Sequence, residues 1–334
     1  MPRPDVRPAR SVPLVRAMSE HAAPPSLRSA LRSGAACRRW CRYWLRDPAV
    51  GLAEHAFFHL FRALPLDLVS RIGARLGRYR GAELARLSQR AGTALGDLAP
   101  SLSEPARAQL LERLRANSGR AFLEALNADR VCSEARVLLA DPVTLSRVVA
   151  SGRPLIFVSV HTANLGDLLG AILLRRVRHR AATTTRPFAN RYRERLAVRM
   201  RAGMDVQILH PSISAARQLL RHLRAPRQSI LLHLDEARGQ QIHFPVFGGP
   251  LPHGGNLTLA LRLARLSGAL LVPVHLRRRL EGAHFMLHLG TPMDLSDPGA
   301  TLTDDEAARQ LDEYFSAVVR RHLDDWQQLY FLRR

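Results

Sequence analysis

A histidine and an aspartate follow a short apolar run in the middle of the chain, in the stretch PLIFVSVHTANLGDLLGA from Pro154 to Ala171. A histidine is a suitable general base because its unperturbed pKa lies near neutrality, and a nearby carboxylate can fix its tautomer and stabilise the imidazolium. His161 and Asp167 are therefore candidates for acid–base chemistry. The alternative is that His161 only caps a helix or binds a loop carbonyl.

The elements around this pair place it at the end of a strand. Leu155 to Val160 is apolar and partly β-branched, which is typical of a buried strand, and Asp167 opens an amphipathic helix. Ligand sites in open α/β sheets lie outside the carboxyl ends of strands. Six positions on a regular helix would separate the two side chains by about 240°. Pairing therefore requires His161 to precede the helix, which the turn over 162–166 permits.

The second half of the chain alternates strand and helix patterns. Strands are predicted at 154–160, 181–185, 205–209, 229–234, 270–276 and 284–289, and helices at 167–178, 190–202, 213–224, 254–267 and 304–322. This alternation predicts an α/β fold with a mixed, partly parallel sheet flanked by helices. Pro273 interrupts its strand and favours an edge position or a bulge there.

The first half has a different character. Residues 1–35 read as a flexible basic tail, 36–142 as an N-terminal helical region, and 143–334 as the α/β domain. The pattern over 38–80 is helical and broken at Pro65, with arginines beside Trp40, Tyr43 and Trp44. Such a segment suits a membrane interface. The alternative is an ordinary amphipathic helix packed on the domain.

The composition limits the partners. The formal charge is +22 and the chain has no lysine, so all 50 basic residues are arginines. This excess favours anionic partners, namely phosphates, an acidic carrier protein, an anionic membrane or nucleic acid. A basic nucleic-acid-binding protein is one alternative, but no recognised nucleic-acid module is present. The three cysteines lack zinc or disulfide spacing, and no signal peptide or membrane-spanning run is expected.

Further candidate ligands lie at predicted strand ends and in the adjoining turns. They are Asn164 in the turn after His161, Arg186 after a short strand, Asp235, Glu236 and Arg238 after the strand 229–234, and Phe247 in the apolar loop FPVFGG. Arginine forks match phosphate geometry, and the loop could line a pocket for an aliphatic chain. The alternative for 229–249 is a plain hairpin with a charged tip.

Several stretches, taken in order, resemble a known family. They are the strand–His–helix start, the Arg186-Pro187 turn, the strand ending in Asp235, the FPVFGG loop, the VPV strand at 272–274, and the tail VVRRHLDDWQQLYFLRR. The segment NSGRAFLEAL from Asn117 to Leu126 fits as well. Over about residues 40–334 the chain resembles the bacterial lipid A late acyltransferases (lauroyl/myristoyl transferases) of the lysophospholipid acyltransferase superfamily.

The resemblance implies transfer of a fatty acyl group from an acyl thioester, of acyl carrier protein or coenzyme A, to a lipid hydroxyl. The expected acceptor is an anionic glycolipid such as a lipid A precursor, with another glycolipid, a lysophospholipid or an aminolipid as alternatives. His161 would be the general base and Arg186 and Arg238 would bind phosphate. The apolar loop from Phe244 to Phe247 would hold the acyl chain. The resemblance implies no cofactor, no metal and no nucleic acid, and a peripheral location on the cytoplasmic face of the bacterial inner membrane.

The chain departs from the family at one position. The family pattern places an acid after four intervening residues, where this chain has Gly166, and Asp167 follows one place later. We expect Asp167 to reach the imidazole through a longer turn. The acid could instead be Asp235 or Glu236, or the dyad could be impaired in a protein that only binds lipid. Backbone N–H groups of the 162–166 turn are candidate donors to the tetrahedral oxygen.

Overall fold

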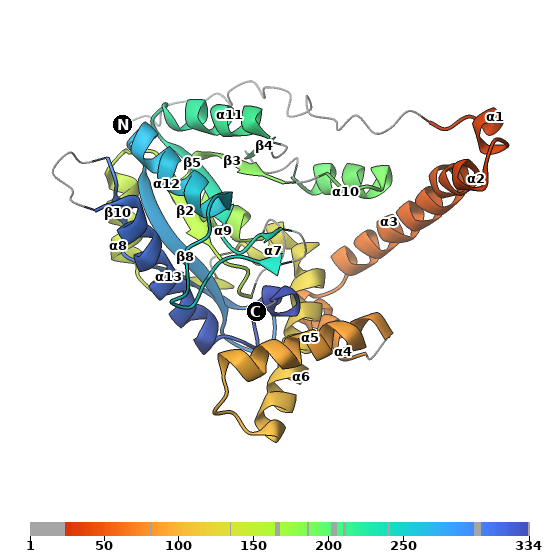
Figure 1. Ribbon diagram of the computed structural model, residues 1–334, viewed down its shortest axis with the longest axis horizontal. Coiled ribbons are helices and arrows are strands. Elements are labelled where there is room, and N and C mark those ends of the chain that lie inside the picture. Colours follow the sequence, from red (N-terminus) through yellow and green to blue (C-terminus); the bar gives the residue numbers. More distant parts are fainter. Residues whose placement is uncertain are drawn as a thin grey trace, which may run out of the picture.

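The computed structural model describes residues 24–79, 82–133, 135–163, 168–185, 187–201, 206–209, 212–238, 241–296 and 302–332. Its centre is one eight-stranded sheet with helices on both faces (Figure 1). The strands are β1 (Val137–Leu139), β2 (Leu155–Ser159), β3 (Arg180–Thr184), β4 (Val206–Leu209), β5 (Gln228–His233), β8 (Leu270–Arg278), β9 (Phe285–Leu289) and β10 (Met293–Asp294). A separate two-stranded hairpin joins β6 (Ala237–Arg238) to β7 (Gln241–Ile242).

The main sheet has the order β1-β9-β8-β2-β5-β3-β4, with β10 pairing β8. Strands β8, β2, β5, β3 and β4 run parallel, whereas β9 and β10 are antiparallel to β8. The predicted α/β fold with a mixed, partly parallel sheet is confirmed, and so are all six predicted strands. The sheet begins at Val137, before the predicted boundary at 142/143, because β1 pairs with β9.

Side chains of β2 alternate between the two faces of the sheet, and each face has its own helices. Ile156 and Val158 belong to the larger core, with α5 (Ala82–Leu98), α11 (Ile213–Leu223), α12 (Gly255–Ser267) and α13 (Asp304–Arg321). Leu155 and Phe157 belong to the other core, with α7 (Ala128–Val131), α8 (Pro142–Ala150) and α9 (Leu168–Val177). This two-sided burial explains why β2 reads as a continuous apolar run.

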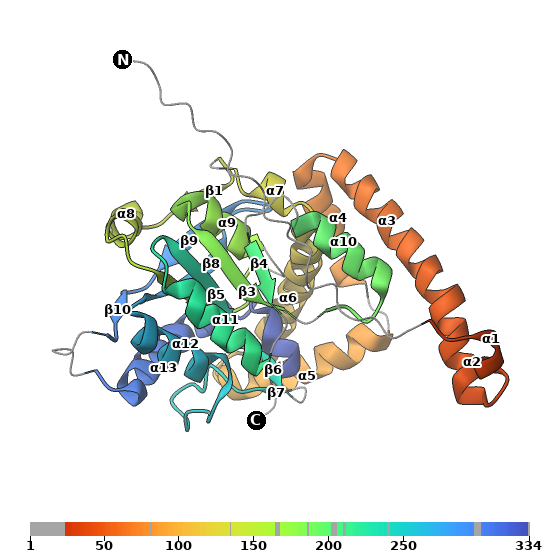
Figure 2. The ribbon, with the colours of Figure 1, turned by 90° about the horizontal axis from the view of Figure 1, so that it is seen from above.

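The N-terminal helices form an arm that extends away from the sheet (Figures 1 and 2). It contains α1 (Leu27–Ala30), α2 (Gly34–Cys41), the π-helical turn Arg42–Arg46 and α3 (Asp47–Ala63), and α10 (Arg191–Arg201) packs beside α3. The predicted tail over 1–35 is thus partly wrong, since Ser26 and Ser33 cap helices within it. Residues 1–23 of that tail lie outside the described residues.

Helices α4 (Leu66–Arg78) and α6 (Glu104–Ala125) cross at close range through glycines. A Cβ added to Gly119 would lie 2.1 Å from the Gly73 carbonyl oxygen, so no larger residue fits at this crossing. Helix α6 also holds the C-terminal segment, because Asn117 Nδ2 donates to the Asp324 carbonyl at 2.9 Å. The segment from Asn117 to Leu126 therefore connects the helical region to the end of the chain.

The prediction that Pro273 marks an edge or a bulge is wrong, because β8 lies between β2 and β9 within the sheet. Pro273 pairs with Val158 of β2, and its carbonyl accepts a hydrogen bond from Gly290 N at 2.8 Å on the opposite side. The backbone nitrogen of Pro273, which carries no hydrogen, therefore faces the gap between the end of β9 and the start of β10. A proline is tolerated there because no ladder hydrogen bond is lost.

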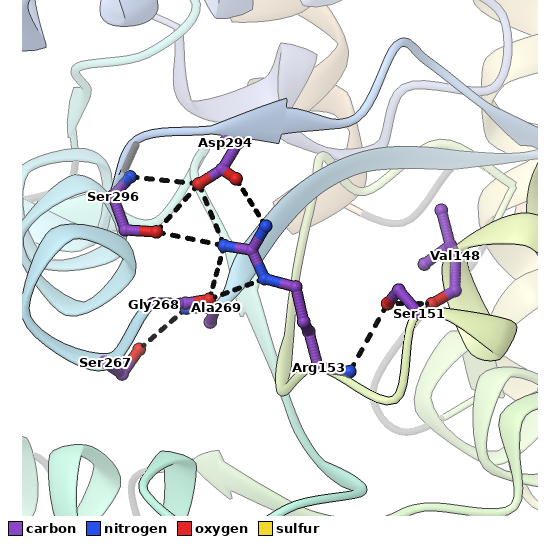
Figure 3. Close-up of polar contacts among 8 residues, drawn as sticks. All are labelled: Val148, Ser151, Arg153, Ser267, Gly268, Ala269, Asp294 and Ser296. Atoms are coloured by element: carbon purple, nitrogen blue, oxygen red, sulfur yellow. Dashed lines mark hydrogen bonds and ion pairs between the residues drawn. The ribbon is translucent and has the colours of Figure 1, made fainter. Parts of the chain in front are cut away.

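Arg153 fastens the start of β2 to neighbouring elements (Figure 3). Its Nε donates to the Gly268 carbonyl at the end of α12 at 2.9 Å, and its guanidinium forms an ion pair with Asp294 of β10. The Arg153 guanidinium is the main reason that the Asp294 pKa lies well below its usual value. These contacts fix the amino end of the strand that carries His161 at its other end.

Candidate active site

His161 lies just beyond the carboxyl end of β2, beside the carboxyl end of β5. Ser159 pairs with His233 in the parallel register of these strands, so His161 and Asp235 lie at the same level. Asp235 contacts His161 twice. His161 N donates to Oδ2 at 2.8 Å, and the ring Nδ1 lies 2.7 Å from Oδ1. One carboxylate therefore fixes both the backbone and the imidazole of His161.

The C-terminal segment completes the surroundings of Asp235. Trp326 is fully buried, and its indole Nε1 donates to Asp235 Oδ2 at 2.9 Å. The segment follows the His161 turn in an antiparallel bridge between Thr162 and Trp326, and Gln327 N donates to the His161 carbonyl at 2.9 Å. The end of the chain thus holds the carboxylate and the histidine in place together.

This geometry decides the tautomer of His161. A carboxylate can only accept, so Nδ1 carries the hydrogen and Nε2 of the neutral ring is left as a proton acceptor. Within the described part of the chain, Nε2 makes no hydrogen bond, and the side chain is 19% exposed. Burial alone would lower the His161 pKa, but the Asp235 charge and hydrogen bond outweigh it and raise this pKa. The ring is therefore a stronger base than a free histidine.

His233, the last residue of β5, stacks on His161 with ring centroids 4.1 Å apart. Burial, with the charge of His161 as a second cause, lowers the His233 pKa to about 3, so this ring stays neutral. Both rings line a cavity of about 170 Å³. Its other walls are mostly apolar and come from β2, β3, β4, β5 and α9, including Phe157, Leu173, Ile208 and Leu231.

Several residues predicted for the site lie outside the described residues. Asn164, Asp167 and Arg186 are among them, and of Arg238 only the backbone position in β6 is described. The predicted pairing of His161 with Asp167 therefore lies outside the described residues and stays a prediction. The acid that the structure places on His161 is Asp235, which was the second alternative from the sequence.

Asp235 and Glu236 were expected to contact substrate. Asp235 is fully buried with its oxygens bound to His161 and Trp326, so it is not exposed to a substrate, which corrects that expectation. Glu236 is half-buried, and its Oε1 accepts a hydrogen bond from Asn256 N at 2.8 Å in the first turn of α12. A carboxylate is favourable at a helix N-terminus, so this contact stabilises α12.

The FPVFGG loop supports the site from behind. The Asp312 carboxylate of α13 accepts hydrogen bonds from the backbone N–H groups of Val246, Phe247 and Gly248. Phe244 is 1% exposed within the core, and the Phe247 ring packs edge-on against Trp326 with centroids 6.1 Å apart. Neither phenylalanine lines the cavity at His161, and the expectation that this loop holds the acyl chain stays a prediction.

Two of the backbone N–H groups proposed for the tetrahedral oxygen are already bonded. Thr162 N donates to the Val160 carbonyl at 2.8 Å, and Ala163 N donates to the Asp325 carbonyl at 2.9 Å. The remaining groups of that turn, at 164–166, lie outside the described residues. The expectation therefore fails for Thr162 and Ala163 and stays a prediction for the rest.

Asp325 lies directly behind the His161 turn and is 6% exposed, and its Oδ1 has no hydrogen-bond partner among the described residues. Burial raises its pKa to about 6, above the unfolded value of about 3.9. The native state therefore holds the extra proton between these values, and stability falls as the pH rises through this window.

We expect Asp325→Asn to raise the free energy of unfolding by about 2 kcal/mol near pH 8 and to change it little near pH 4. Urea unfolding at the two pH values measures this difference. A variant less stable than the wild type near pH 8 would contradict the assignment.

Trp326 and Gln328 contribute to the site without having been predicted. The side-chain amide of Gln328 lies 3.3 Å from His161 Nδ1. Both residues come from a segment 165 or more positions after His161, so no local periodicity links them. The presence of a tryptophan in a polar tail was the one signal available, since a buried indole N–H needs an acceptor.

Comparison with known proteins decides the family. The model of the family "Bacterial lipid A biosynthesis acyltransferase" matches residues 39–334. The chain belongs to this family. No curated protein matches it. Among solved structures, the acyltransferase is similar to the 1-acyl-sn-glycerophosphate (LPA) acyltransferase PlsC from Thermotoga maritima, with 13% identity and a TM-score of 0.38, over 76% of this chain and 96% of that chain.

Proposed function

We propose that this acyltransferase moves a fatty acyl group from an acyl thioester to a hydroxyl of an anionic glycolipid such as a lipid A precursor, with His161 as general base. The observation that carries the proposal is the His161–Asp235 contact at 2.7 Å beside an apolar cavity, in a chain of the acyltransferase family. Acyl carrier protein is the expected donor, because an arginine-rich surface attracts an acidic carrier.

In the proposed reaction, Nε2 of His161 takes the proton of the acceptor hydroxyl while its oxygen attacks the thioester carbonyl carbon. A carbon–oxygen bond forms and the charge passes to the carbonyl oxygen. The tetrahedral intermediate then collapses, the carbon–sulfur bond breaks, and the thiolate leaves and recovers the proton from the imidazolium. Asp235 is a positioning residue, since it stabilises the imidazolium without touching the substrate.

We assign the acyl chain to the cavity at His161 rather than to the FPVFGG loop. Phe157, Leu173 and Leu231 give this cavity apolar walls, and His161 and His233 are among its lining residues. Burying each methylene of a chain contributes about 0.8 kcal/mol. A chain held there would present its thioester carbonyl to the general base.

We also propose that α3 docks on the membrane that carries the lipid acceptor, at the cytoplasmic face of the inner membrane. Leu52, Phe57 and Leu60 are 74%, 52% and 55% exposed and fall within about 140° of the helix surface. Phe58 and Phe61 face the protein instead. Within the described residues, no helix has the length and hydropathy to cross a bilayer. Exposed apolar side chains on an amphipathic helix are typical of interfacial binding.

The triple variant Leu52→Ser, Phe57→Ser, Leu60→Ser should bind vesicles at least about tenfold more weakly, because each lost side chain removes apolar burial. Vesicle co-sedimentation measures this effect. The matched control replaces three other exposed apolar residues, Val143→Ser, Leu266→Ser and Leu280→Ser, and should bind as the wild type does. Equal losses in the two triples, or none in the first, would overturn α3 docking.

The reaction is tested by transfer of labelled acyl groups from acyl carrier protein and from coenzyme A to a panel of lipids. The panel contains a lipid A precursor, another glycolipid, a lysophospholipid and an aminolipid. Transfer to one acceptor, lost in His161→Ala, supports the proposal and names the substrate. Absence of transfer from either donor to every acceptor, with lipid binding retained, would favour a protein that only binds lipid.

A further inference from the structure

A second cavity lies near the amino ends of the parallel strands, whereas His161 lies beyond the carboxyl end of β2. We call it the arginine cavity: about 750 Å³ between α3, α7, α9 and α10, lined by Arg62, Arg175, Arg178, Arg180 and Arg199. Arg180 pairs with Gln228 at the start of β5, which is level with Pro154 at the start of β2. His161 is seven residues further along, roughly 20 Å away. The arginine cavity thus lies at the other end of the strands from His161, although Ala171 and Leu174 line both this cavity and the one at His161.

The charges of the arginine cavity are mostly uncompensated. Its one lining carboxylate, Asp129, is held in a two-pronged contact by Arg62, with both distances 2.8 Å. The side chains of the other four arginines make no hydrogen bond or ion pair with any residue that the structure describes. These four arginines are exposed and line one cavity from α9, the turn after it, β3 and α10. Guanidinium groups match the oxygens of a phosphate.

The remaining walls indicate an amphiphile rather than a plain ion. Phe58, Leu174 and Met200 give the arginine cavity an apolar side. His179 also lines it and is 5% exposed, and burial keeps its pKa low, so this ring is neutral. Its Nδ1 is buried and has no partner among the described residues.

The arginine cavity also contacts α3, the helix that we propose docks on the bilayer. Phe58 and Arg62 line it from α3, the helix whose other face carries the exposed Leu52, Phe57 and Leu60. Helices α3 and α10 lie side by side in Figure 2, with α1 and α2 at the far end of α3. Helix α3 therefore lies between the arginine cavity and its own exposed apolar face.

We propose that the arginine cavity binds the phosphate of an anionic membrane phospholipid, as a site separate from the one where acyl transfer occurs. This proposal goes beyond the proposed function, because the arginine cavity would select the membrane to which the protein binds and not the lipid that reacts. The arginines hold the phosphate oxygens, and the apolar wall accepts the glycerol and the first methylenes.

The test compares two triple variants with the same change of charge in the full-length chain. The cavity variant is Arg178→Gln, Arg180→Gln, Arg199→Gln. The control is Arg217→Gln, Arg221→Gln, Arg224→Gln, which changes two residues of α11 and its C-cap. All three arginines are exposed, and α11 packs on the opposite face of the sheet. Co-sedimentation with phosphatidylcholine vesicles, with and without phosphatidylglycerol, is measured near physiological ionic strength. Circular dichroism confirms that each variant is folded.

We expect the cavity variant to bind the phosphatidylglycerol vesicles about tenfold more weakly and the control within about twofold of the wild type. Equal losses in both variants would show a general charge effect and overturn the proposal, as would wild-type binding by the cavity variant. Full displacement from vesicles by glycerol 1-phosphate, but not by chloride at equal ionic strength, would assign the site to a soluble phosphate ester instead of a lipid.

Acyl transfer in detergent micelles separates this proposal from the proposed function. There the cavity variant should keep the wild-type kcat and KM, because its arginines lie far from His161. A raised KM for the acceptor lipid would place its phosphate in the arginine cavity and overturn the separate site. Loss of transfer in His161→Ala together with normal vesicle binding would leave the arginine cavity intact and confirm the independence of the two sites.

Discussion

Asp235→Asn should lower kcat for acyl transfer by about three orders of magnitude while leaving the acceptor KM nearly unchanged. The carboxylate accepts from Nδ1 of His161 at 2.7 Å and from its backbone N–H at 2.8 Å, and it is fully buried. An amide in its place can hold the ring in the wrong tautomer and cannot stabilise the imidazolium. Effects of this size follow the loss of a general base or its orienting group.

The same substitution should move the acidic limb of the pH–rate profile to lower pH. Asp235 raises the His161 pKa against the opposing effect of burial, and only the neutral ring accepts a proton. In the wild type, kcat/KM should therefore rise with pH with an apparent pKa above that of a free histidine. Without the carboxylate, the effect of burial dominates, and the apparent pKa of the acidic limb should fall below that of a free histidine. Stopped assays across pH 5 to 9 measure the acidic limb for the wild type and for Asp235→Asn.

Asp325→Asn is the matched control, because Asp325 is also buried and belongs to the same C-terminal segment but does not contact the imidazole. Its kcat should stay within about threefold of the wild type. If the two asparagine variants lose activity equally, the effect reports general damage to the segment. An unshifted limb in Asp235→Asn would show that this carboxylate does not set the His161 pKa.

The largest effect on stability is expected from Glu124→Leu, at about 3–5 kcal/mol. Glu124 of α6 is fully buried and receives two hydrogen bonds from Arg278 of β8, at 2.8 and 2.7 Å. Arg278 itself is only 7% exposed, and Arg120 is buried nearby. Removing the carboxylate takes away the hydrogen-bonded counter-charge of Arg278 and the nearest acid to the buried Arg120. Urea unfolding followed by circular dichroism measures the loss.

The double variant Glu124→Leu, Arg278→Leu tests the reason for that loss. Removal of both charges should restore part of the stability, because the penalty for the buried Arg278 charge disappears while Arg120 stays buried without Glu124. A double variant as unstable as Glu124→Leu would instead indicate that shape and packing at the α6–β8 contact determine the energy.

Local patterns in the sequence predict most of the fold. The apolar run Leu155 to Val160 is buried on both faces, and the residues on each face alternate, so the strand is visible from its composition alone. The same holds for the amphipathic helices of the second half. Strand β1 was missed because three residues carry too little pattern. Pro273 was read as an edge or a bulge because the sequence does not show where the strands beside it end.

The candidate site was only half predictable. His161 follows from its place after a strand, but its partner depends on the register between β2 and β5, 74 positions apart in sequence. Trp326 depends on how the C-terminal segment returns to the turn, which α6 and the Arg278 contact help to fix. Such non-local contacts leave no periodic signal in the chain.

The measurement that tests the account most directly is acyl transfer by three variants assayed side by side: His161→Ala, Asp235→Asn and Asp167→Asn. We expect the first two to lose at least about a thousandfold in kcat and the third to stay within about tenfold of the wild type. Near-complete loss in Asp167→Asn with activity retained in Asp235→Asn would contradict the His161–Asp235 pair and assign the base's partner to the acid that follows the histidine along the chain.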